Sequence, residues 1–234
     1  MRVAIIPARG GSKRIANKNI KNFAGKPIIS YPITTAIESG LFEKVIVSTD
    51  SEQIAETATK LGASVPFIRP HELADDFTPT APVLAHAIEW LSNNGVAPEF
   101  ACCIYATTPF IRTEDLTTGI NNLLQNEEVL STFSVTSFPF QIFRALKINS
   151  AGYLNMFWPE HETTRSQDLP DAYHDAGQFY WVRCRDFLLE PKLYTQKSKP
   201  VILPRHLVQD IDTQEDWETA ELMYKLLNLH QEKC

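Results

Sequence analysis

The chain has 234 residues, of which 44% are hydrophobic and 21% are charged, and its formal net charge is −6 at pH 7. This composition is ordinary for a globular domain and excludes a disordered or low-complexity chain. The acidic balance argues against a general nucleic-acid binder, because such a protein needs an excess of basic residues to replace the counterions on phosphates.

Apolar runs of strand length alternate with segments of helical period through the first part of the chain. Strands are expected, in chain order, at residues 2–7, 44–50, 64–68, 100–107 and 129–135. Helices are expected between them, at residues 26–40, 52–62, 82–95 and 113–126. Ser51 is placed to cap the second helix, and Pro32 predicts a kink in the first. The pattern predicts an α/β fold whose parallel sheet is covered by helices on both faces.

The alternation breaks after about residue 136. Residues 143–157 have the pattern of a β-hairpin whose two arms meet around "NSAG", and a polar, irregular stretch follows to residue 177. A strand is expected again at 178–184, and a helix at 214–230 closes the chain. We therefore expect one α/β domain over residues 1–234, with an excursion from the main sheet at about 138–175.

The loop after the first strand, "ARGGSKR", is rich in cations and glycine. It carries Arg9, Lys13 and Arg14 beside Gly10 and Gly11. Glycines permit a close backbone approach and positive φ, so that successive N–H groups can form an anion-binding nest, to which cations add charge-assisted hydrogen bonds. The loop matches neither GxxxxGK[ST] nor GxGxxG. A solvated charged turn is the alternative, but ligands of such sheets bind beyond the carboxyl ends of the strands, so we favour a phosphate-bearing ligand.

A pair of carboxylates lies near the end of the chain, in "VQDIDT". Asp210 and Asp212 are two residues apart, and on an extended segment their side chains point the same way. Two carboxylates beside phosphates suit Mg²⁺, which keeps several waters and takes phosphate oxygens as further ligands. The alternative is a cap for the following helix, in which Thr213 and Asp216 form a capping box.

The stretch "IPARGGSKRIANKNI" closely resembles the N-terminal signature of the acylneuraminate cytidylyltransferases, the CMP-sugar synthetases. The resemblance continues in order over nearly the whole chain, through "VIVSTDS", "RPHELADD", "YATTPFIR", "DAGQFYW" and "QDIDTQEDW". It implies a Rossmann-like fold, a homodimer formed through the excursion, and a reaction with Mg²⁺ in which CTP and a nine-carbon 2-keto sugar acid give a CMP-sugar and pyrophosphate. Within the family, the branch that activates pseudaminic acid matches best.

The resemblance also implies which residues bind CTP. Those residues are Arg9, Gly10, Gly11, Ser12, Lys13, Lys18, Asn19, Arg69, Thr78 and Thr80. Arg9 and Lys13 would neutralise charge on the leaving pyrophosphate and, with Asp210, form the catalytic set. Arg69 and the two threonines would read the edge of cytosine, and Asp210 and Asp212 would hold the metal. Arg14 is expected on the surface, and Asp75 and Asp76 as solvated acids.

The sugar half of the site departs from the sialic acid enzymes. The residues implied in sugar binding are Tyr105, Arg144, Arg165, His174, Gln178 and Tyr180. Tyr105 stands where the sialic acid enzymes have glutamine, and His174 where they have arginine, which indicates a different nonulosonic acid. For Gln178 and Tyr180, core packing is an equal alternative. Three other functions remain open: activation of sialic, legionaminic or ketodeoxyoctonic acid, a glycosyltransferase with a DxD motif, and a non-catalytic nucleotide-binding module.

The first apolar run and the cysteines bear on the compartment. That run has about five residues and is followed by charge, whereas the apolar region of a signal peptide needs about 7–15. No stretch approaches the roughly 20 apolar residues of a membrane span. Cys102, Cys103, Cys184 and Cys234 lack zinc-ligand spacing and are expected to be reduced thiols. We therefore expect a cytoplasmic protein without a nucleic-acid or membrane partner.

Overall fold

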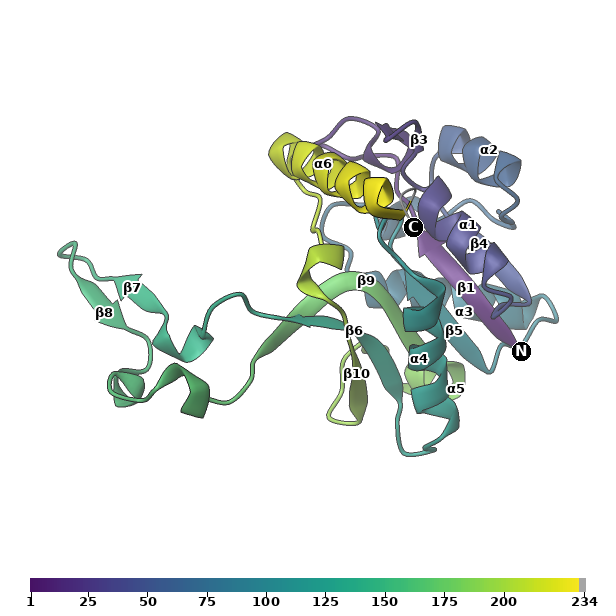
Figure 1. Cartoon of the computed structure of the whole chain (residues 1–234). Helices are drawn as coiled ribbons and strands as arrows, with labels where there is room; N and C mark the ends of the chain where they lie inside the picture. The colour runs from purple at the N-terminus through teal and green to yellow at the C-terminus, as the bar shows by residue number, and fades with distance from the viewer. Residues whose placement is uncertain (232–234) are drawn as a thin grey trace.

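A computed structural model describes residues 1–231 and shows a six-stranded sheet at the centre of the chain (Figure 1). Its strands lie in the order β10 (Ser198–Ile202), β6 (Ser131–Ser137), β9 (Tyr173–Arg183), β5 (Phe100–Ile104), β1 (Arg2–Pro7) and β4 (Lys44–Ser48). β1 pairs in parallel with β4 and β5, and β10 pairs in parallel with β6. Only β9 runs antiparallel to its neighbours, β5 and β6. The predicted α/β fold with a mostly parallel sheet is confirmed.

Helices cover both faces of this sheet. One face packs against α1 (Ser30–Glu38), α2 (Glu52–Lys60) and α4 (Thr113–Leu124), and the other against α3 (Thr80–Asn93) and α5 (Cys184–Leu189). Successive side chains of a strand point to opposite faces, so Ala4 and Ile6 join the first cluster while Val3 and Ile5 join the second. A strand buried on both faces must be apolar throughout, which explains the unbroken apolar run of β1.

The predictions for two proline-containing segments need correction. The strand expected at residues 64–68 is reduced to two isolated bridges, because Pro66 has no N–H to donate to a ladder. The helix expected from residue 26 begins at Ser30, since Lys26–Pro27 (β3) pairs with Asn22–Phe23 (β2). Pro32 lies in the first turn of α1, where N–H groups have no partner within the helix, and the helix continues to Glu38. The predicted cap of α2 is confirmed, since the Ser51 side chain accepts a hydrogen bond from the Ile54 amide.

The segment between β6 and β9 leaves the sheet and projects to one side of the molecule (Figure 1). It contains an antiparallel hairpin of β7 (Leu146–Ile148) and β8 (Leu154–Met156), joined by a turn in which Asn149 Oδ1 accepts the amides of Ala151 and Tyr153. Its apolar side chains are largely solvent-exposed, with Ile148 73% and Leu154 64% exposed. The hairpin thus has no hydrophobic core of its own.

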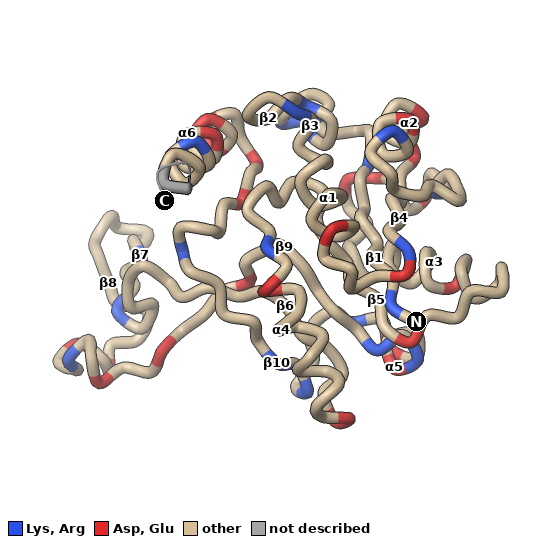
Figure 2. Tube along the Cα trace, turned by 45° about the vertical axis from the view of Figure 1, so that its right-hand side comes forward, with Lys and Arg blue, Asp and Glu red and all other residues tan. Residues whose placement is uncertain are grey.

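The last helix, α6 (Gln214–Gln231), packs Trp217 against Phe23 and Tyr31 in a third, smaller core cluster. Short 3₁₀ helices lie at Lys18–Ile20, His71–Leu73, Ile142–Arg144, Pro159–His161, Ser166–Asp168 and Arg205–Leu207. Among residues 1–231, no helix combines the length and the apolar character that crossing a membrane requires. Cys102, Cys103 and Cys184 are buried free thiols, whereas Cys234 lies outside the described residues. Basic and acidic residues are interspersed along the chain (Figure 2).

Candidate active site

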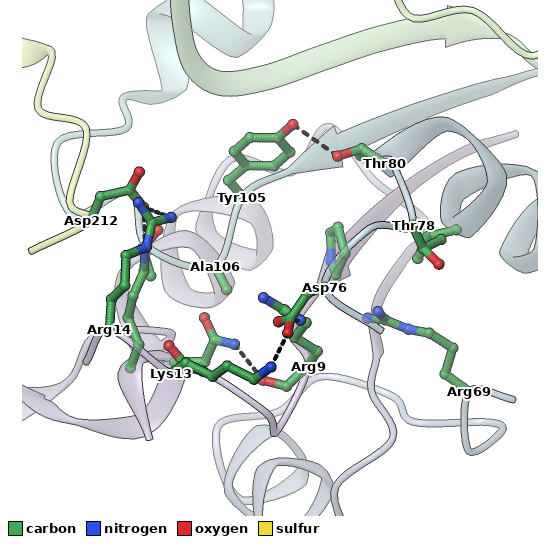
Figure 3. Close-up of a pocket in the computed structure, with 16 residues that line it drawn as sticks. Arg9, Lys13, Arg14, Arg69, Asp76, Thr78, Thr80, Tyr105, Ala106 and Asp212 are labelled. Atoms are coloured by element: carbon green, nitrogen blue, oxygen red, sulfur yellow. Dashed lines mark hydrogen bonds and ion pairs between the residues drawn. The ribbon is translucent and has the colours of Figure 1, made fainter. Parts of the chain in front are cut away.

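A pocket of about 500 Å³ lies at the carboxyl ends of the adjacent strands β1 and β5 (Figure 3). From β1 the chain goes on to β4 on one side of the sheet, and from β5 it goes on to β6 on the other, so the pocket lies where the strand order reverses. Its lining includes these residues predicted from the sequence: Arg9, Ser12, Lys13, Lys18, Asn19, Arg69, Thr78, Thr80, Tyr105 and Asp212. The fold therefore brings four distant segments to one cavity.

The first loop is fixed by contacts with β4 and its connection to α2. The Gly10 amide donates to Asp50 Oδ1 at 2.8 Å, and Asn19 Nδ2 donates to the Arg9 carbonyl at 2.9 Å. A Cβ at Gly10 would lie 2.9 Å from Ser51 Cβ, so only glycine fits against this helix cap. Neither Gly10 nor Gly11 has a positive φ, and the Gly10 N–H is already bonded. The expected nest of left-handed glycines is therefore wrong, and Asp50 is a positioning residue that sequence reasoning missed.

Asp76 is an acceptor for two cations of this loop. Arg9 Nη1 lies 2.5 Å from Asp76 Oδ1, and Lys13 Nζ contacts the second oxygen of the same carboxylate. These bonds from Lys13 and Arg9 lower the pKa of Asp76. The expectation that Asp76 is merely a solvated acid is wrong, because it pairs with Arg9 and Lys13. Arg9 is 67 residues away in the chain, so no local pattern revealed the contact.

The neighbouring residue, Asp75, stabilises the backbone turn that leads into α3. Asp75 Oδ1 accepts the amides of Phe77 and Thr78 at 2.9 and 2.6 Å, and the Thr78 hydroxyl at 2.7 Å. These hydrogen bonds lower the pKa of Asp75 and fix the turn that leads into α3. Thr78 lines the pocket with its hydroxyl already engaged in this turn.

Asp212 is the centre of a second ion cluster, at the left of Figure 3 and across the pocket from Arg69. It lies 2.8 Å from Arg14 Nη2 and 3.2 Å from Lys18 Nζ, and Lys18 also donates to the Ile211 carbonyl. Arg14 is exposed, as expected from the sequence, and it also lines the pocket. Lys18 and Asp212 are 194 residues apart in the chain, so only the tertiary fold brings them together.

Asp210 lies outside the lining of this pocket, with an exposed side chain. Partial desolvation, and then the charge of Asp212, raise the pKa of Asp210. Asp216 accepts the amide and the hydroxyl of Thr213 at 2.7 and 2.8 Å, and the Thr213 hydroxyl accepts the Asp216 amide, so the predicted capping box is confirmed. Asp212 thus lines the pocket and Asp210 does not, and no cluster of three or more potential metal ligands occurs within residues 1–231.

Arg69 forms a buried wall of the pocket and is only 5% exposed. Its Nε donates to the Ser48 hydroxyl at 3.1 Å, and its two terminal nitrogens donate to the carbonyls of Ser48 and Leu73. Burial lowers the pKa of Arg69. A guanidinium has five N–H donors, so two remain for a ligand once these three hydrogen bonds are made.

Tyr105 meets Thr80 on the adjacent wall, where their hydroxyl oxygens lie 2.9 Å apart. Tyr180 and Gln178 are buried behind this wall and do not line the pocket. The Tyr180 hydroxyl donates to Asp175 Oδ2 at 2.7 Å, and Gln178 Nε2 donates to the Leu207 carbonyl at 2.6 Å. Burial raises the pKa of Tyr180 above its usual range. In this chain both side chains pack and bond internally, as the core-packing alternative anticipates.

The remaining residues of the predicted sugar set lie away from the pocket. Arg144 is exposed at the base of the hairpin, and Arg165 pairs with Asp168 at 2.6 Å within the excursion. His174 is the second residue of β9, where its Nδ1 donates to the Asp175 carbonyl at 2.8 Å and its ring packs against Phe138. The pocket of a single chain is therefore lined by cations of the first loop, while Arg144 and Arg165 lie on the excursion.

Known proteins resemble this chain along its whole length. A family model described as cytidylyltransferase matches residues 3–233. The pseudaminic acid cytidylyltransferase of Campylobacter jejuni is 43% identical and covers 96% of each chain. The CMP-N,N'-diacetyllegionaminic acid synthase of Legionella pneumophila is 32% identical over 98% of this chain and 97% of its own. A solved structure of CMP:2-keto-3-deoxy-manno-octonic acid synthetase complexed with CTP shares the fold, with a TM-score of 0.69 over 96% of this chain and 98% of its own at 16% identity.

Proposed function

The chain belongs to the cytidylyltransferase family, and we propose that it transfers CMP from CTP to pseudaminic acid, a nine-carbon 2-keto sugar acid, with release of pyrophosphate. Its resemblance to the CMP-sugar synthetases is confirmed at the level of the family. The observation that carries the choice of sugar is the full-length match to a relative named for pseudaminic acid. The cations that line the pocket support the CTP half of the proposal independently.

The proposed reaction is an in-line displacement at the α-phosphorus of CTP. The hydroxyl on C2 of the sugar forms the new P–O bond, the bond to the β-phosphate oxygen breaks, and that electron pair leaves with pyrophosphate. Arg9 and Lys13, with the Gly11 amide and the Ser12 side chain, stabilise the charge that grows on the leaving group. Lys18 adds positive charge on the phosphate side of the site. Asn19 positions the first loop through its hydrogen bond to the Arg9 carbonyl.

The proposed acceptor of the hydroxyl proton is Asp210. Partial desolvation and the charge of Asp212 raise the pKa of Asp210, so this carboxylate is a stronger base than an ordinary aspartate. Asp212 is already committed to Arg14 and Lys18 and is the weaker candidate.

One observation favours a magnesium ion at Asp210 and Asp212. The charge of Asp212 contributes to the raised pKa of Asp210, which means that the two carboxylates repel each other and that a cation between them would relieve the repulsion. Mg²⁺ commonly takes one or two carboxylates and completes its shell with waters and substrate phosphates. When bound here, it would supply charge neutralisation at the phosphates and lower the pKa of the attacking hydroxyl.

Cytosine recognition is proposed on the wall made by Arg69, Thr78 and Thr80. The two N–H donors left on Arg69 suit the O2 and N3 acceptors of the base, and the carbonyls of the 78–80 segment suit its amino group. Thr80 shares a hydrogen bond with Tyr105, so the residues proposed to bind cytosine lie directly beside a residue proposed to bind the sugar.

The sugar carboxylate is proposed to meet Tyr105 and His174 of one subunit, backed by Gln178 and Tyr180, and the excursion cations Arg144 and Arg165 of a second copy. The hairpin of the excursion is exposed and apolar, and a two-stranded hairpin is marginally stable without a packing partner. A homodimer would cover it. Ile148→Asp should therefore convert the protein to a monomer in light scattering, with CTP binding kept and CMP transfer to the sugar acid lost. An unchanged dimer would contradict this use of the hairpin.

The deciding experiment measures pyrophosphate release from CTP and Mg²⁺ with pseudaminic, legionaminic, sialic and ketodeoxyoctonic acids offered separately. We expect release with pseudaminic acid alone. Release with another acid would keep the reaction and overturn the choice of sugar. Tight CTP binding without release with any acid would favour the non-catalytic module.

We place the reaction in the cytoplasm, where CTP is made.

A further inference from the structure

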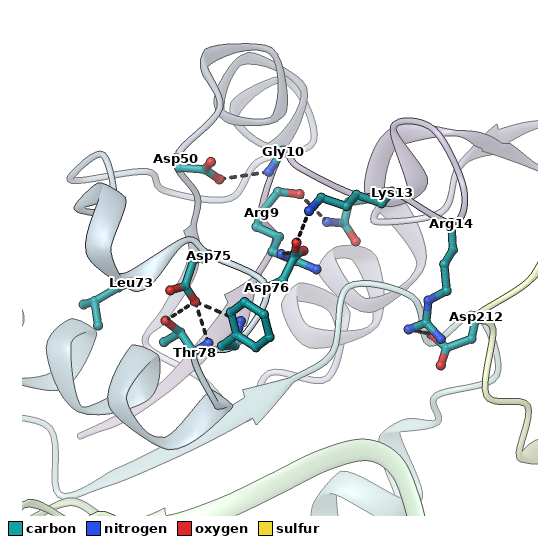
Figure 4. A network of polar contacts seen from close by, with 12 residues as sticks. Arg9, Gly10, Lys13, Arg14, Asp50, Leu73, Asp75, Asp76, Thr78 and Asp212 are labelled. Carbon is teal, nitrogen blue, oxygen red and sulfur yellow. Dashed lines mark hydrogen bonds and ion pairs between the residues drawn. The ribbon is translucent and has the colours of Figure 1, made fainter.

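Asp76 binds both cations of the first loop that are proposed to meet the triphosphate (Figure 4). All three side chains line the pocket. The carboxylate uses one oxygen for Arg9 Nη1 and the other for Lys13 Nζ, so it occupies donors of the kind that phosphate oxygens would use. We propose that Asp76 is the resident counter-ion of this loop, which holds Arg9 and Lys13 toward the pocket and gives them up to the triphosphate. The inference rests on the proposed function, since it needs a polyphosphate ligand.

The surroundings of Asp76 determine which partner moves. Asp75 fixes the backbone on the far side of Asp76 by accepting the amides of Phe77 and Thr78. Lys13, in contrast, has a side chain that is 79% exposed, while that of Arg9 is 34% exposed. The backbone that carries the Asp76 carboxylate is therefore held by this turn, and the long, exposed lysine is the group that transfers to the phosphate. Arg9 has further N–H donors and can turn toward the phosphate by a smaller movement.

This exchange makes Asp76 an intramolecular competitor of the ligand. A phosphate oxygen bound to Lys13 and Arg9 would lie within a few ångströms of the carboxylate, where like charges repel. The triphosphate must therefore displace at least one ion pair, which weakens its binding. The same competition helps pyrophosphate to leave after the reaction, because Asp76 can take back Lys13 and Arg9. Asp76 thus acts as a positioning residue that tunes affinity and product release.

Calorimetric binding of CTP to the intact protein tests the exchange. Asp76→Asn keeps the size of the side chain and removes its charge. Glu72→Gln is the matched control, since Glu72 is an exposed acid of the same segment with no ion pair to Arg9 or Lys13. At low salt we expect Asp76→Asn to bind CTP about three- to tenfold more tightly than the wild type, with the gain shrinking as salt is added. Glu72→Gln should stay within about twofold of the wild type.

A second variant tests whether the gain in CTP affinity depends on Lys13. In a Lys13→Ala background, Asp76→Asn should gain less affinity, because one of the two exchanged pairs is already absent. Equal gains in both backgrounds would mean a general field effect and would overturn the exchange. Unchanged or weaker binding by Asp76→Asn would overturn it as well. Weakening that occurs only when Mg²⁺ is present would identify Asp76 as a metal ligand instead.

Inorganic triphosphate serves as a second probe and separates this inference from the proposed function. Triphosphate binding that Asp76→Asn tightens, together with no CTP binding by the wild type, would support the exchange and overturn the nucleotide assignment. CTP binding by the wild type with no difference between Asp76→Asn and Glu72→Gln would overturn the exchange alone. Failure of the wild type to bind either ligand would overturn both.

Discussion

The two glycines of the first loop should respond differently to the same substitution. In Gly10→Ala the new methyl carbon would lie 2.9 Å from Ser51 Cβ, closer than real Cβ contacts are found, whereas in Gly11→Ala it would meet nothing within 4 Å. Relieving such an overlap costs about 1–3 kcal/mol, and replacing glycine by alanine at a compatible φ returns about 0.4–1 kcal/mol. Gly10→Ala should therefore lose roughly 1–2 kcal/mol, while Gly11→Ala gains about 0.4–1 kcal/mol.

For a chain of this length, 1 kcal/mol shifts Tm by about 2–4 °C, so Gly10→Ala should melt about 2–8 °C below the wild type and Gly11→Ala about 1–4 °C above it. Gly10 also anchors the backbone between Arg9 and Lys13, and a misplacement of about 1 Å at such a site can cost about 10²-fold in turnover. Thermal melts followed by circular dichroism, together with pyrophosphate release, measure both effects. Equal Tm values, or a larger Tm loss in Gly11→Ala, would refute the packing argument. Lost turnover in Gly11→Ala at an unchanged Tm would instead indicate contact with the ligand.

Three further substitutions test other parts of the site. Lys13→Ala should lower turnover about 10²–10³-fold with an unchanged circular dichroism spectrum, and near wild-type pyrophosphate release would contradict its role. Arg69→Lys loses two of the three hydrogen bonds that Arg69 donates, which should cost roughly 2 kcal/mol of stability and lower Tm by about 4–8 °C. CTP binding should weaken as well. An unchanged Tm would contradict the structural role of these hydrogen bonds. Asp210→Asn should raise Tm at pH 7, because a pKa raised above 3.8 means that ionisation opposes folding. That gain should vanish in melts below about pH 3, where both states are protonated, and an equal gain at both pH values would argue against the raised pKa.

Much of the sheet could be predicted from local periodicity, and the failures have local causes. The runs that became β1, β4 and β5 are buried on both faces, so their sequences are apolar throughout and easy to recognise. β10 is a mostly exposed strand with a proline in its middle and gave no apolar signal. α5 has six residues, too few to show a helical period.

The parts of the site that give a local signal in the sequence could be predicted. A cation-rich loop directly after a buried strand is a local signal, and so is the capping box of Thr213 and Asp216, which closes within one turn. Asp50 and Asp76 gave no comparable signal. Each looks like an ordinary exposed acid in the sequence, and each acquires its role only from a partner on another segment.

The sequence by itself determined most of the elements of this protein, its family and the residue types at the carboxyl ends of the strands, because these depend on short-range periodicity and on ordered motifs along the chain. The tertiary structure alone decided which charges meet. Arg9 and Asp76 are 67 residues apart in the chain and Lys18 and Asp212 are 194 apart, yet each pair lies in contact across one pocket. Electrostatic pairing depends on distance in space rather than on separation in the chain, so the partners of these cations become visible only once the strands are in order.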